Sequence, residues 1–266
     1  MDVVEVLFYI EIMGRERDSV EMELGELSAR LKRERFRVKR IDVGEVIEDE
    51  RMDPLRFSSI VEVELEAPLD KVFRAAVAYS PTMVEVFRPG RIEIAGAKLS
   101  KILQDIIGEI STVMKEKGVM PSLPKLDDVP MPPIGFDEEE LWEMIYEGRN
   151  ILSRLHFRVK GEDEKVVREI LAKALLVEGC GVNSLSVSGG DGFTVEAEVV
   201  SSFESLVGAV AKYLPDDVQI IEPEVVDITL PELQNSLSDL GSISMGIKLK
   251  EEMEEAYERD VFSFRL

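Results

Sequence analysis

The stretch YSPTMVEVFRPGRIEI, residues Tyr79–Ile94, returns later in the chain as YLPDDVQIIEPEVVDI, residues Tyr213–Ile228. When residues 61–105 are set over residues 195–239 without a gap, 12 of the 45 pairs are identical, and most other apolar positions stay apolar. A gapless match of this length, which keeps both prolines of each phrase, indicates an internal duplication. The offset of 134 residues is too long for a solenoid repeat and fits two whole domains.

Hydrophobic patterning gives each copy the predicted element order β-α-β-β-α-β. Four stretches per copy alternate apolar and polar residues, as strands do, and two carry apolar residues at helical spacing. This order predicts an α+β fold built from tandem duplicated ferredoxin-like (βαββαβ) domains. Each copy is predicted to continue into a short extended piece and an extra helix, which begins near Ala97 or Leu230. In the first copy the predicted strands are residues 3–12, 36–43, 60–67 and 83–87, and the predicted helices are residues 20–31 and 69–79.

A segment rich in proline separates the copies and predicts three parts. Five prolines fall within residues 118–136, and proline at this density favours a stiff, extended connector. The predicted parts are residues 1–118 for copy 1 with its C-terminal helix, residues 119–148 for the connector and a docking helix, and residues 149–266 for copy 2 with its C-terminal helix.

The docking helix is predicted over residues 137–148. Asp137 and Glu140 have the spacing of a capping box at its start. Trp142, Ile145 and Tyr146 give it an apolar face, so we expect it to dock between the copies through these three side chains.

Composition restricts the class of partner and the compartment. The formal net charge is −22, which opposes non-specific binding to nucleic acid or to an anionic membrane. Cys180 is the only cysteine, so an internal disulfide is excluded. The sequence shows neither a secretory signal pattern nor an apolar run of about 20 residues, which predicts a soluble, cytoplasmic protein. Asn and Gln together number only six, while Glu, Arg and Lys are plentiful, which is typical of a thermophilic, archaeal source.

The strongest candidate ligand site lies on the first and third strands of copy 2. His156 is the only histidine and points away from Leu155 and Phe157 in an alternating strand. Neighbouring strands in this topology place their outward residues on one helix-free face. We expect an anion or polar metabolite to bind there, with cross-strand ion pairing as the alternative explanation. The candidate residues are Arg154, His156, Arg158, Glu196 and Glu198.

A basic segment in copy 1 is the second candidate. Residues 30–40 hold seven basic side chains in eleven positions, which suggests a site for phosphate or nucleic acid. The alternative is the protection of an edge strand by cationic side chains. The candidate anion or nucleic-acid residues are Arg33, Arg35, Arg37 and Lys39.

The remaining polar clusters predict neither a metal site nor a catalytic residue. Carboxylates gather in residues 45–53, but their spacing matches no calcium loop. Cys180, between two glycines, is expected to be a buried and inert thiol. The sequence assigns no cofactor and leaves the oligomeric state open, a homo-oligomer included.

Three function hypotheses follow. The first is non-catalytic binding of a small molecule or a protein partner through paired ferredoxin-like domains, which makes an enzyme the less favoured class. The alternative is an enzyme that uses carboxylates and arginines, metal-assisted or not, with a site between the copies. The third is RNA binding through residues 30–40.

Overall fold

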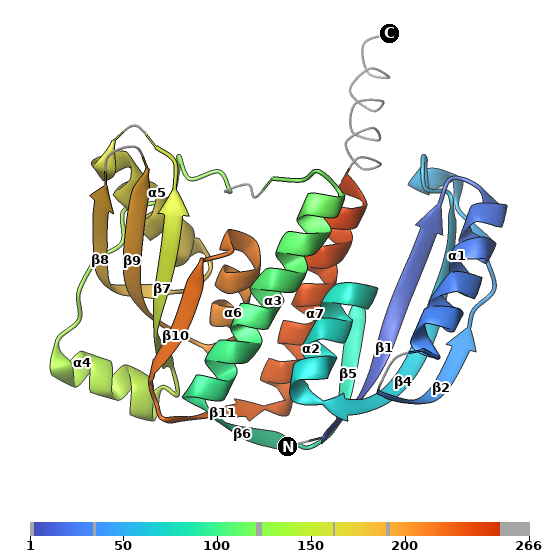
Figure 1. Ribbon diagram of the computed structural model, residues 1–266, viewed down its shortest axis with the longest axis horizontal. Coiled ribbons are helices and arrows are strands. Elements are labelled where there is room, and N and C mark those ends of the chain that lie inside the picture. The colour runs from blue at the N-terminus through green and yellow to red at the C-terminus, as the bar shows by residue number, and fades with distance from the viewer. Residues whose placement is uncertain (1–2, 34–35, 121–123, 162, 190–191, 251–266) are drawn as a thin grey trace, which may run out of the picture. The chain divides into compact units, whose positions relative to one another are not determined.

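The computed structural model describes residues 3–33, 36–120, 124–161, 163–189 and 192–250. Within these residues the chain is a mixed α+β fold with seven α-helices and several antiparallel sheets (Figure 1), which confirms the α+β part of the predicted fold. The helices are α1 (Arg17–Leu31), α2 (Leu69–Tyr79), α3 (Gly96–Glu116), α4 (Glu138–Trp142), α5 (Glu164–Val177), α6 (Phe203–Tyr213) and α7 (Leu230–Lys248). The strands are β1 (Val3–Gly14), β2 (Arg37–Val43), β3 (Ile47–Glu48), β4 (Phe57–Pro68), β5 (Met83–Arg88), β6 (Arg91–Ala95), β7 (Ile151–Val159), β8 (Gly181–Gly189), β9 (Phe193–Ser201), β10 (Asp217–Glu222) and β11 (Val225–Thr229).

The chain divides into two compact units, each assembled from segments distant in sequence. Unit 1 comprises the described parts of Met1–Gly90, Val113–Val119 and Leu237–Leu266. Unit 2 comprises Arg91–Thr112 and the described parts of Met120–Ser236. Unit 1 therefore includes the end of α7, and unit 2 includes β6 and most of α3.

Unit 1 is built on an antiparallel sheet, here called sheet A, with strand order β2-β4-β1-β5 and with β3 paired to β4. Alternation along β1 buries Val4, Val6 and Phe8 completely, since successive side chains of a strand point to opposite faces. Helices α1 and α2 cover this apolar face (Figure 1). The apolar stripe predicted for α1 is confirmed: its buried residues are Val20, Leu24, Leu27 and Leu31.

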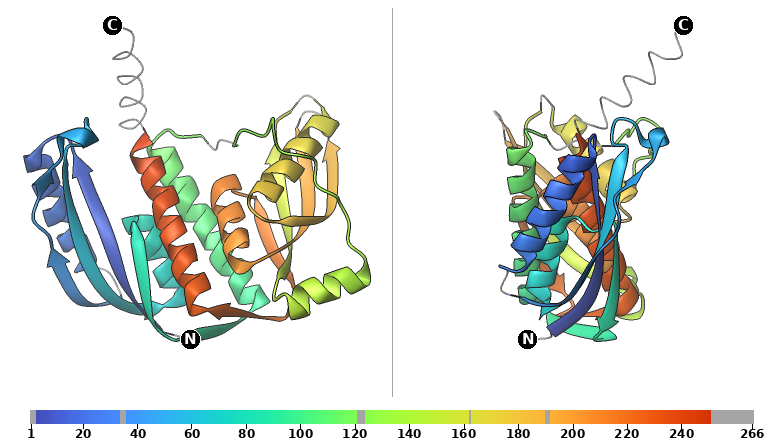
Figure 2. Two further views of the ribbon diagram at one scale, coloured as in Figure 1. Left: turned by 180° about the vertical axis from the view of Figure 1, so that it is seen from behind. Right: turned by 90° about the vertical axis from the view of Figure 1, so that its right-hand side faces the viewer.

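Unit 2 is built on a second antiparallel sheet, sheet C, with strand order β10-β7-β9-β8. Helices α5 and α6 lie over one of its faces, which Figure 2 shows from behind. Connector residues pair with the start of its β8 edge: Ile134 forms a parallel bridge with Val182, whose carbonyl accepts a 3.0 Å hydrogen bond from the Gly135 amide. At this position the edge strand no longer offers its carbonyl to another chain.

The docking helix forms as α4, but its packing differs from the prediction. Its predicted capping box between Asp137 and Glu140 is present. Ile145 is buried against Leu152 and Val200, whereas the side chains of Trp142 and Tyr146 are 54% and 52% exposed. The prediction that all three side chains dock was wrong for the two aromatic residues. A π-helical turn over Glu143–Glu147 changes the residue spacing, so that the three side chains do not form one stripe.

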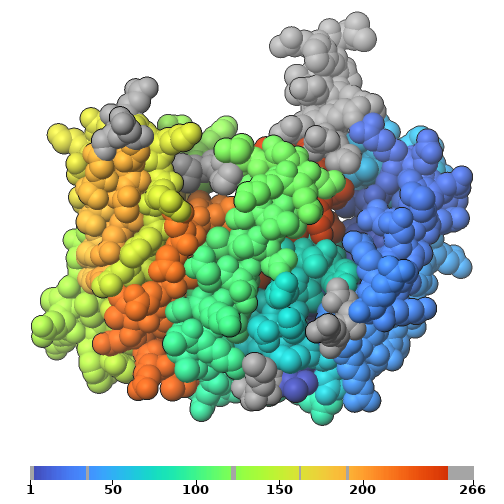
Figure 3. Space-filling model, in the orientation of Figure 1, coloured from blue at the N-terminus to red at the C-terminus, as the bar shows by residue number. Residues whose placement is uncertain are grey.

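Strands β6 and β11 pair with each other as a two-stranded sheet. Along the chain, β6 leads directly into α3 and β11 leads directly into α7. Its antiparallel pairing sets Glu93 opposite Asp227. In unit 2 the Ser100 hydroxyl of α3 accepts a 2.9 Å hydrogen bond from the Ile220 amide of β10. The outer side of α3 forms part of the surface shown in Figure 3.

Among the described residues, none of the helices has the length and the apolar character needed to cross a bilayer.

Candidate functional site

The open face of sheet C brings together four of the five residues predicted to bind a ligand. The β7–β9 register sets Arg154 opposite Glu198 and His156 opposite Glu196. The Arg154 guanidinium donates a 2.7 Å hydrogen bond to Glu198. The His156 Nε2 atom lies 3.0 Å from Glu196 Oε2, although it makes no hydrogen bond of good geometry. Arg158 does not join them, because it donates to Asp216 at 2.6 Å.

The charges of this cluster are largely balanced by one another. The hydrogen bond to Glu198 raises the pKa of Arg154, and Glu198 also accepts a 3.3 Å hydrogen bond from the Asn183 amide. The Nε atom of Arg154 and the Nε2 atom of His156 are buried without a hydrogen-bond partner. Both atoms lie near the Glu196 carboxylate, at 3.0 Å for His156 and 3.7 Å for Arg154, so a ligand or a water molecule would have to compete with this carboxylate for them.

The basic segment of copy 1 is held by carboxylates on the open face of sheet A. Lys39 pairs with Glu5 and lies 3.4 Å from Glu66. The hydrogen bond from Lys39 lowers the pKa of Glu5. The Arg37 guanidinium lies 3.7 Å from Glu66, and its side chain is 74% exposed. The cationic charge of this strand is therefore partly neutralised, which weakens the case for nucleic acid.

A β-bulge explains a residue that the alternating pattern missed. The pairing of β2 with β4 shifts between Val38 and Arg40. Arg40 therefore lies on the same face as Lys39, because a bulge places one extra residue on a strand. Both approach Glu64, at 3.9 Å for Arg40 and 3.8 Å for Lys39, and Arg40 also lies 3.4 Å from Glu62. Of the other predicted residues in this segment, Arg33 is exposed just after α1, and Arg35 lies outside the described residues.

The other polar groups singled out in the sequence show no reactive arrangement. In the part of the chain that the structure describes, no three His, Cys, Asp or Glu side chains are grouped to hold a metal ion. The acidic loop instead contains β3 and a short 3₁₀ helix over Glu50–Met52. Cys180 is fully buried, and this burial raises the pKa of its thiol to about 12. A thiol in this state is not a nucleophile at neutral pH.

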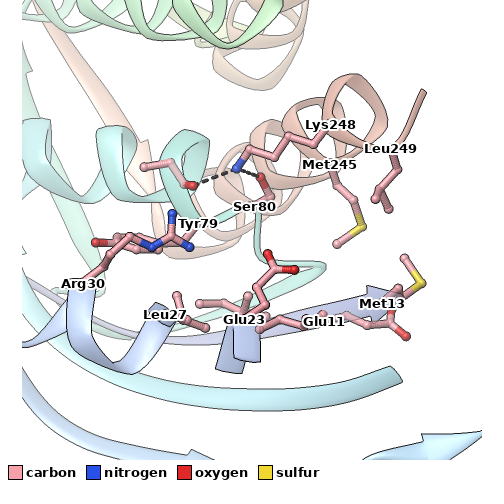
Figure 4. A pocket seen from close by; sticks show the side chains of 13 residues that line it. Glu11, Met13, Glu23, Leu27, Arg30, Tyr79, Ser80, Met245, Lys248 and Leu249 are labelled. Atoms are coloured by element: carbon pink, nitrogen blue, oxygen red, sulfur yellow. Dashed lines mark hydrogen bonds between the residues drawn. The ribbon is translucent and has the colours of Figure 1, made fainter. Parts of the chain in front are cut away.

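Sequence reasoning did not find a pocket in unit 1 of about 100 Å³ (Figure 4). It lies where α2 ends, between β1, α1 and the end of α7. Tyr79 is the last residue of α2, and Ser80 follows in a left-handed conformation with φ 51°. The lining residues are Ile10, Glu11, Ile12, Met13, Glu23, Leu27, Arg30, Ala78, Tyr79, Ser80, Met245, Lys248 and Leu249.

Lys248 supplies the most unusual group of this pocket. Its amine donates a 2.8 Å hydrogen bond to the Ala78 carbonyl and a 2.7 Å hydrogen bond to Ser80 Oγ. Burial lowers the pKa of the amine to about 8, and Arg30 adds to the effect, while Glu23 opposes it. Arg30 itself lies over the Tyr79 ring, 5.9 Å from its centroid. Figure 4 shows Glu23 and Arg30 pointing from α1 toward the turn that holds Ser80.

The electrostatic character of the pocket is therefore mixed. Two cations, Arg30 and Lys248, and two carboxylates, Glu11 and Glu23, line this space. The other lining residues are apolar except Tyr79 and Ser80. A weakly solvated amine beside a guanidinium favours an anionic group, because desolvation strengthens electrostatic attraction. The sequence offers only a slight signal for Lys248. This lysine lies four residues after Ser244 and three after Met245 on the helix α7, and Ser244 is buried.

Comparison with known proteins gives a family but no activity. No curated protein and no solved structure matches the chain. The model of the MJ0538 family matches residues 5–254, which is most of the sequence. The chain therefore belongs to the MJ0538 family.

Proposed function

We propose that the protein is a non-catalytic binding protein for a small molecule with an anionic group, held in the unit 1 pocket. The observation that carries this proposal is the Lys248 amine, which lies in a cavity with the Arg30 guanidinium beside it. In a chain with a net charge of −22, the Arg30 guanidinium attracts an anion to this cavity, and the Lys248 amine adds to the attraction while it is protonated. The Glu11 and Glu23 carboxylates of the same lining oppose this attraction.

The size and walls of the pocket narrow the ligand class. A volume of about 100 Å³ holds only a few non-hydrogen atoms, since a liquid water molecule takes up roughly 30 Å³. Leu27, Met245 and Leu249 offer an apolar wall for a short carbon chain. A small carboxylate with a short apolar part suits both features.

A binding experiment with the full chain tests the proposal. Acetate, propionate and inorganic phosphate are titrated by calorimetry and by thermal shift, since a ligand of the folded state raises the melting temperature. We expect binding of at least one small carboxylate and a loss of affinity of about tenfold or more for Lys248→Met. Lys71→Met, which removes an exposed lysine of α2 outside the pocket, is the matched control. Equal affinity of wild type and Lys248→Met would remove the pocket from consideration.

The cluster on sheet C remains the second candidate ligand site, with Arg154, His156, Glu196 and Glu198 as its residues. Arg158, the fifth predicted residue, pairs with Asp216 instead. It is favoured by the buried nitrogen atoms of Arg154 and His156 that lack hydrogen-bond partners. The test is His156→Gln, which removes the imidazole: a ligand of this site should lose affinity in this variant and keep it in Lys248→Met. The same cluster would serve the alternative, an enzyme based on carboxylates and arginines. RNA binding through Arg33, Arg35, Arg37 and Lys39 is less well supported, because Lys39 and Arg40 are already paired with carboxylates.

We also propose that the fold arose by tandem duplication of a ferredoxin-like unit, with domains at residues 1–118 and 149–266 and a connector between them. Both sheets have the same strand order in terms of each copy's own elements, as expected of βαββαβ units. Asp227, which pairs with Glu93, stands at the repeat offset from it. The left-handed residues Ser80 and Leu214 are separated by the same offset. The cytoplasmic location and the thermophilic, archaeal source stay proposals that composition alone supports.

A further inference from the structure

The hydrogen bonds around Lys248 have a fixed direction. The Ser244 hydroxyl donates to the Val77 carbonyl at 2.7 Å, and the Ser80 hydroxyl lies 3.0 Å from Ser244 Oγ, to which it donates. The Ser80 oxygen therefore accepts from Lys248, and the Ala78 carbonyl can only accept. Both partners of the amine are acceptors.

This arrangement also accommodates the neutral form of the amine, which a pKa of about 8 makes abundant near pH 8. A neutral amine has two N–H groups, and here both have acceptors, at Ala78 and at Ser80. Its lone pair then remains without a donor among these contacts. A protonated amine would carry a third N–H that the same two acceptors do not satisfy.

The surroundings of Lys248 make the neutral amine more accessible than it is in an ordinary lysine. Burial is the main cause that lowers its pKa to about 8, and the cations Arg30 and Lys117 act in the same direction. Glu23 and Glu116 act against it. An amine that is desolvated and placed next to another cation is one of the ways in which proteins make lysine nucleophilic.

We propose that Lys248 is a nucleophile that forms a Schiff base with a small molecule carrying an aldehyde or ketone carbonyl next to a carboxylate, that is, a 2-oxo acid. This inference rests on the proposed function, because it places the ligand's anionic group in the same pocket, beside the Arg30 guanidinium. A guanidinium binds a carboxylate through two parallel hydrogen bonds, which leaves the adjacent carbonyl carbon for the amine.

The reaction balances without a further reactant. The Lys248 nitrogen adds its lone pair to the carbonyl carbon, and the carbonyl π electrons move to oxygen, which gives a carbinolamine after proton transfer. The carbinolamine hydroxyl then takes a proton from solvent and leaves as water, and the nitrogen and carbon share a double bond. The resulting iminium keeps one N–H, which can donate to the Ala78 carbonyl.

Reductive trapping of the full chain tests the inference. The protein is incubated with pyruvate or glyoxylate and sodium cyanoborohydride near pH 8, and the modified lysine is identified by mass spectrometry of peptides. We expect Lys248 to be modified at least about tenfold faster than the other lysines. Lys248→Arg keeps a cation that can hydrogen-bond to Ala78 and Ser80 but lacks a primary amine, so it should lose the fast modification. Lys71→Arg, on the exposed side of α2, should retain it.

The outcomes separate the two proposals. If pyruvate raises the melting temperature but labels all lysines at similar slow rates, Lys248 is not a nucleophile, and the binding proposal stands. If acetate, propionate and pyruvate all leave the melting temperature unchanged while pyruvate is trapped on Lys248, the reactive amine stands, and the proposal of an anion-binding pocket fails. The absence of both binding and selective labelling overturns both.

Discussion

The ends of α2 and α6 share a backbone conformation but differ in the chemistry around it. Each helix ends in a tyrosine, Tyr79 or Tyr213, and is followed by a residue in the left-handed conformation. The amide of that residue donates to the carbonyl four residues earlier in both cases, and a proline comes next. The turn is therefore a property of the fold, and it recurs whatever side chain occupies the left-handed position.

The surroundings of the two turns decide their chemistry. After α2, Ser80 accepts from the Lys248 amine beside a pocket. After α6, the single hydroxyl hydrogen of Tyr213 instead has two acceptors within reach, the Ala174 carbonyl at 3.0 Å and Glu178 at 3.1 Å. Burial raises the pKa of Tyr213, with the Glu178 charge as the next cause, and Lys212 neutralises Glu178 at 2.8 Å. One turn thus leaves an amine for a ligand, whereas the other satisfies its polar groups internally.

The largest expected effect comes from the approach of α7 to the turn after α2. A Cβ at Gly241 would lie 2.0 Å from the Pro81 carbonyl oxygen, so Gly241→Ala must push α7 away from the turn after α2. We expect a loss of about 3 kcal/mol or more in the free energy of unfolding, measured by urea denaturation. Gly246→Ala in the same helix meets nothing within 4 Å and should gain up to about 1 kcal/mol. Equal stability of the two variants would contradict the close packing.

The second prediction concerns pH and Lys248. Its pKa is lowered from 10.5 to about 8 in the folded state, so between these values the unfolded chain binds a proton that the folded chain has released. The contribution of Lys248 to the free energy of unfolding therefore rises as the pH increases from about 8 to 10.5. Relative to Lys248→Met, the wild type should gain roughly 2 kcal/mol between pH 8 and pH 10, as measured by urea unfolding at both values. A difference that does not change with pH would show that the amine titrates in its ordinary range.

The third prediction tests the internally satisfied turn. Tyr213→Phe removes the hydroxyl that donates to Ala174 and Glu178 and should cost about 1–2 kcal/mol of unfolding free energy. Tyr146→Phe is the control, because that hydroxyl donates to Glu222 from an exposed side chain, and it should change stability by less than about 0.5 kcal/mol. If both changes had the same effect, burial of the Tyr213 hydroxyl would have no energetic role.

The smallest effects distinguish the two left-handed residues directly. Leu214 has φ 47° and Ser80 has φ 51°, and glycine adopts this region without the steric cost that other residues bear. Leu214→Gly should therefore raise the thermal midpoint slightly, by the equivalent of about 0.5 kcal/mol. Ser80→Gly gains the same backbone relief but loses the oxygen bound to Lys248, so it should lower the midpoint. Shifts of the same sign would mean that the Ser80 hydroxyl contributes little.

Much of the local structure could be predicted, because local patterns carry it. Alternation placed Arg154 and His156 on one face of β7 with Glu196 and Glu198 opposite on β9, and the capping box marked the start of α4. The failures arose where one residue changes the phase of a pattern. The bulge in β2 turned Arg40 to the carboxylate face, and no property of the segment alone reveals a bulge.

Three features of the protein follow from the sequence alone: the repeated segment, the alternation that separates apolar from charged strand faces, and the net charge of −22. These features depend on residue type and on spacings of a few residues. Only the tertiary structure decided that Lys248 meets Ser80, which is 168 residues away. A contact over such a distance depends on how α7 packs against α2 and β5, and side-chain periodicity within a helix shows which face is buried without showing what lies against it.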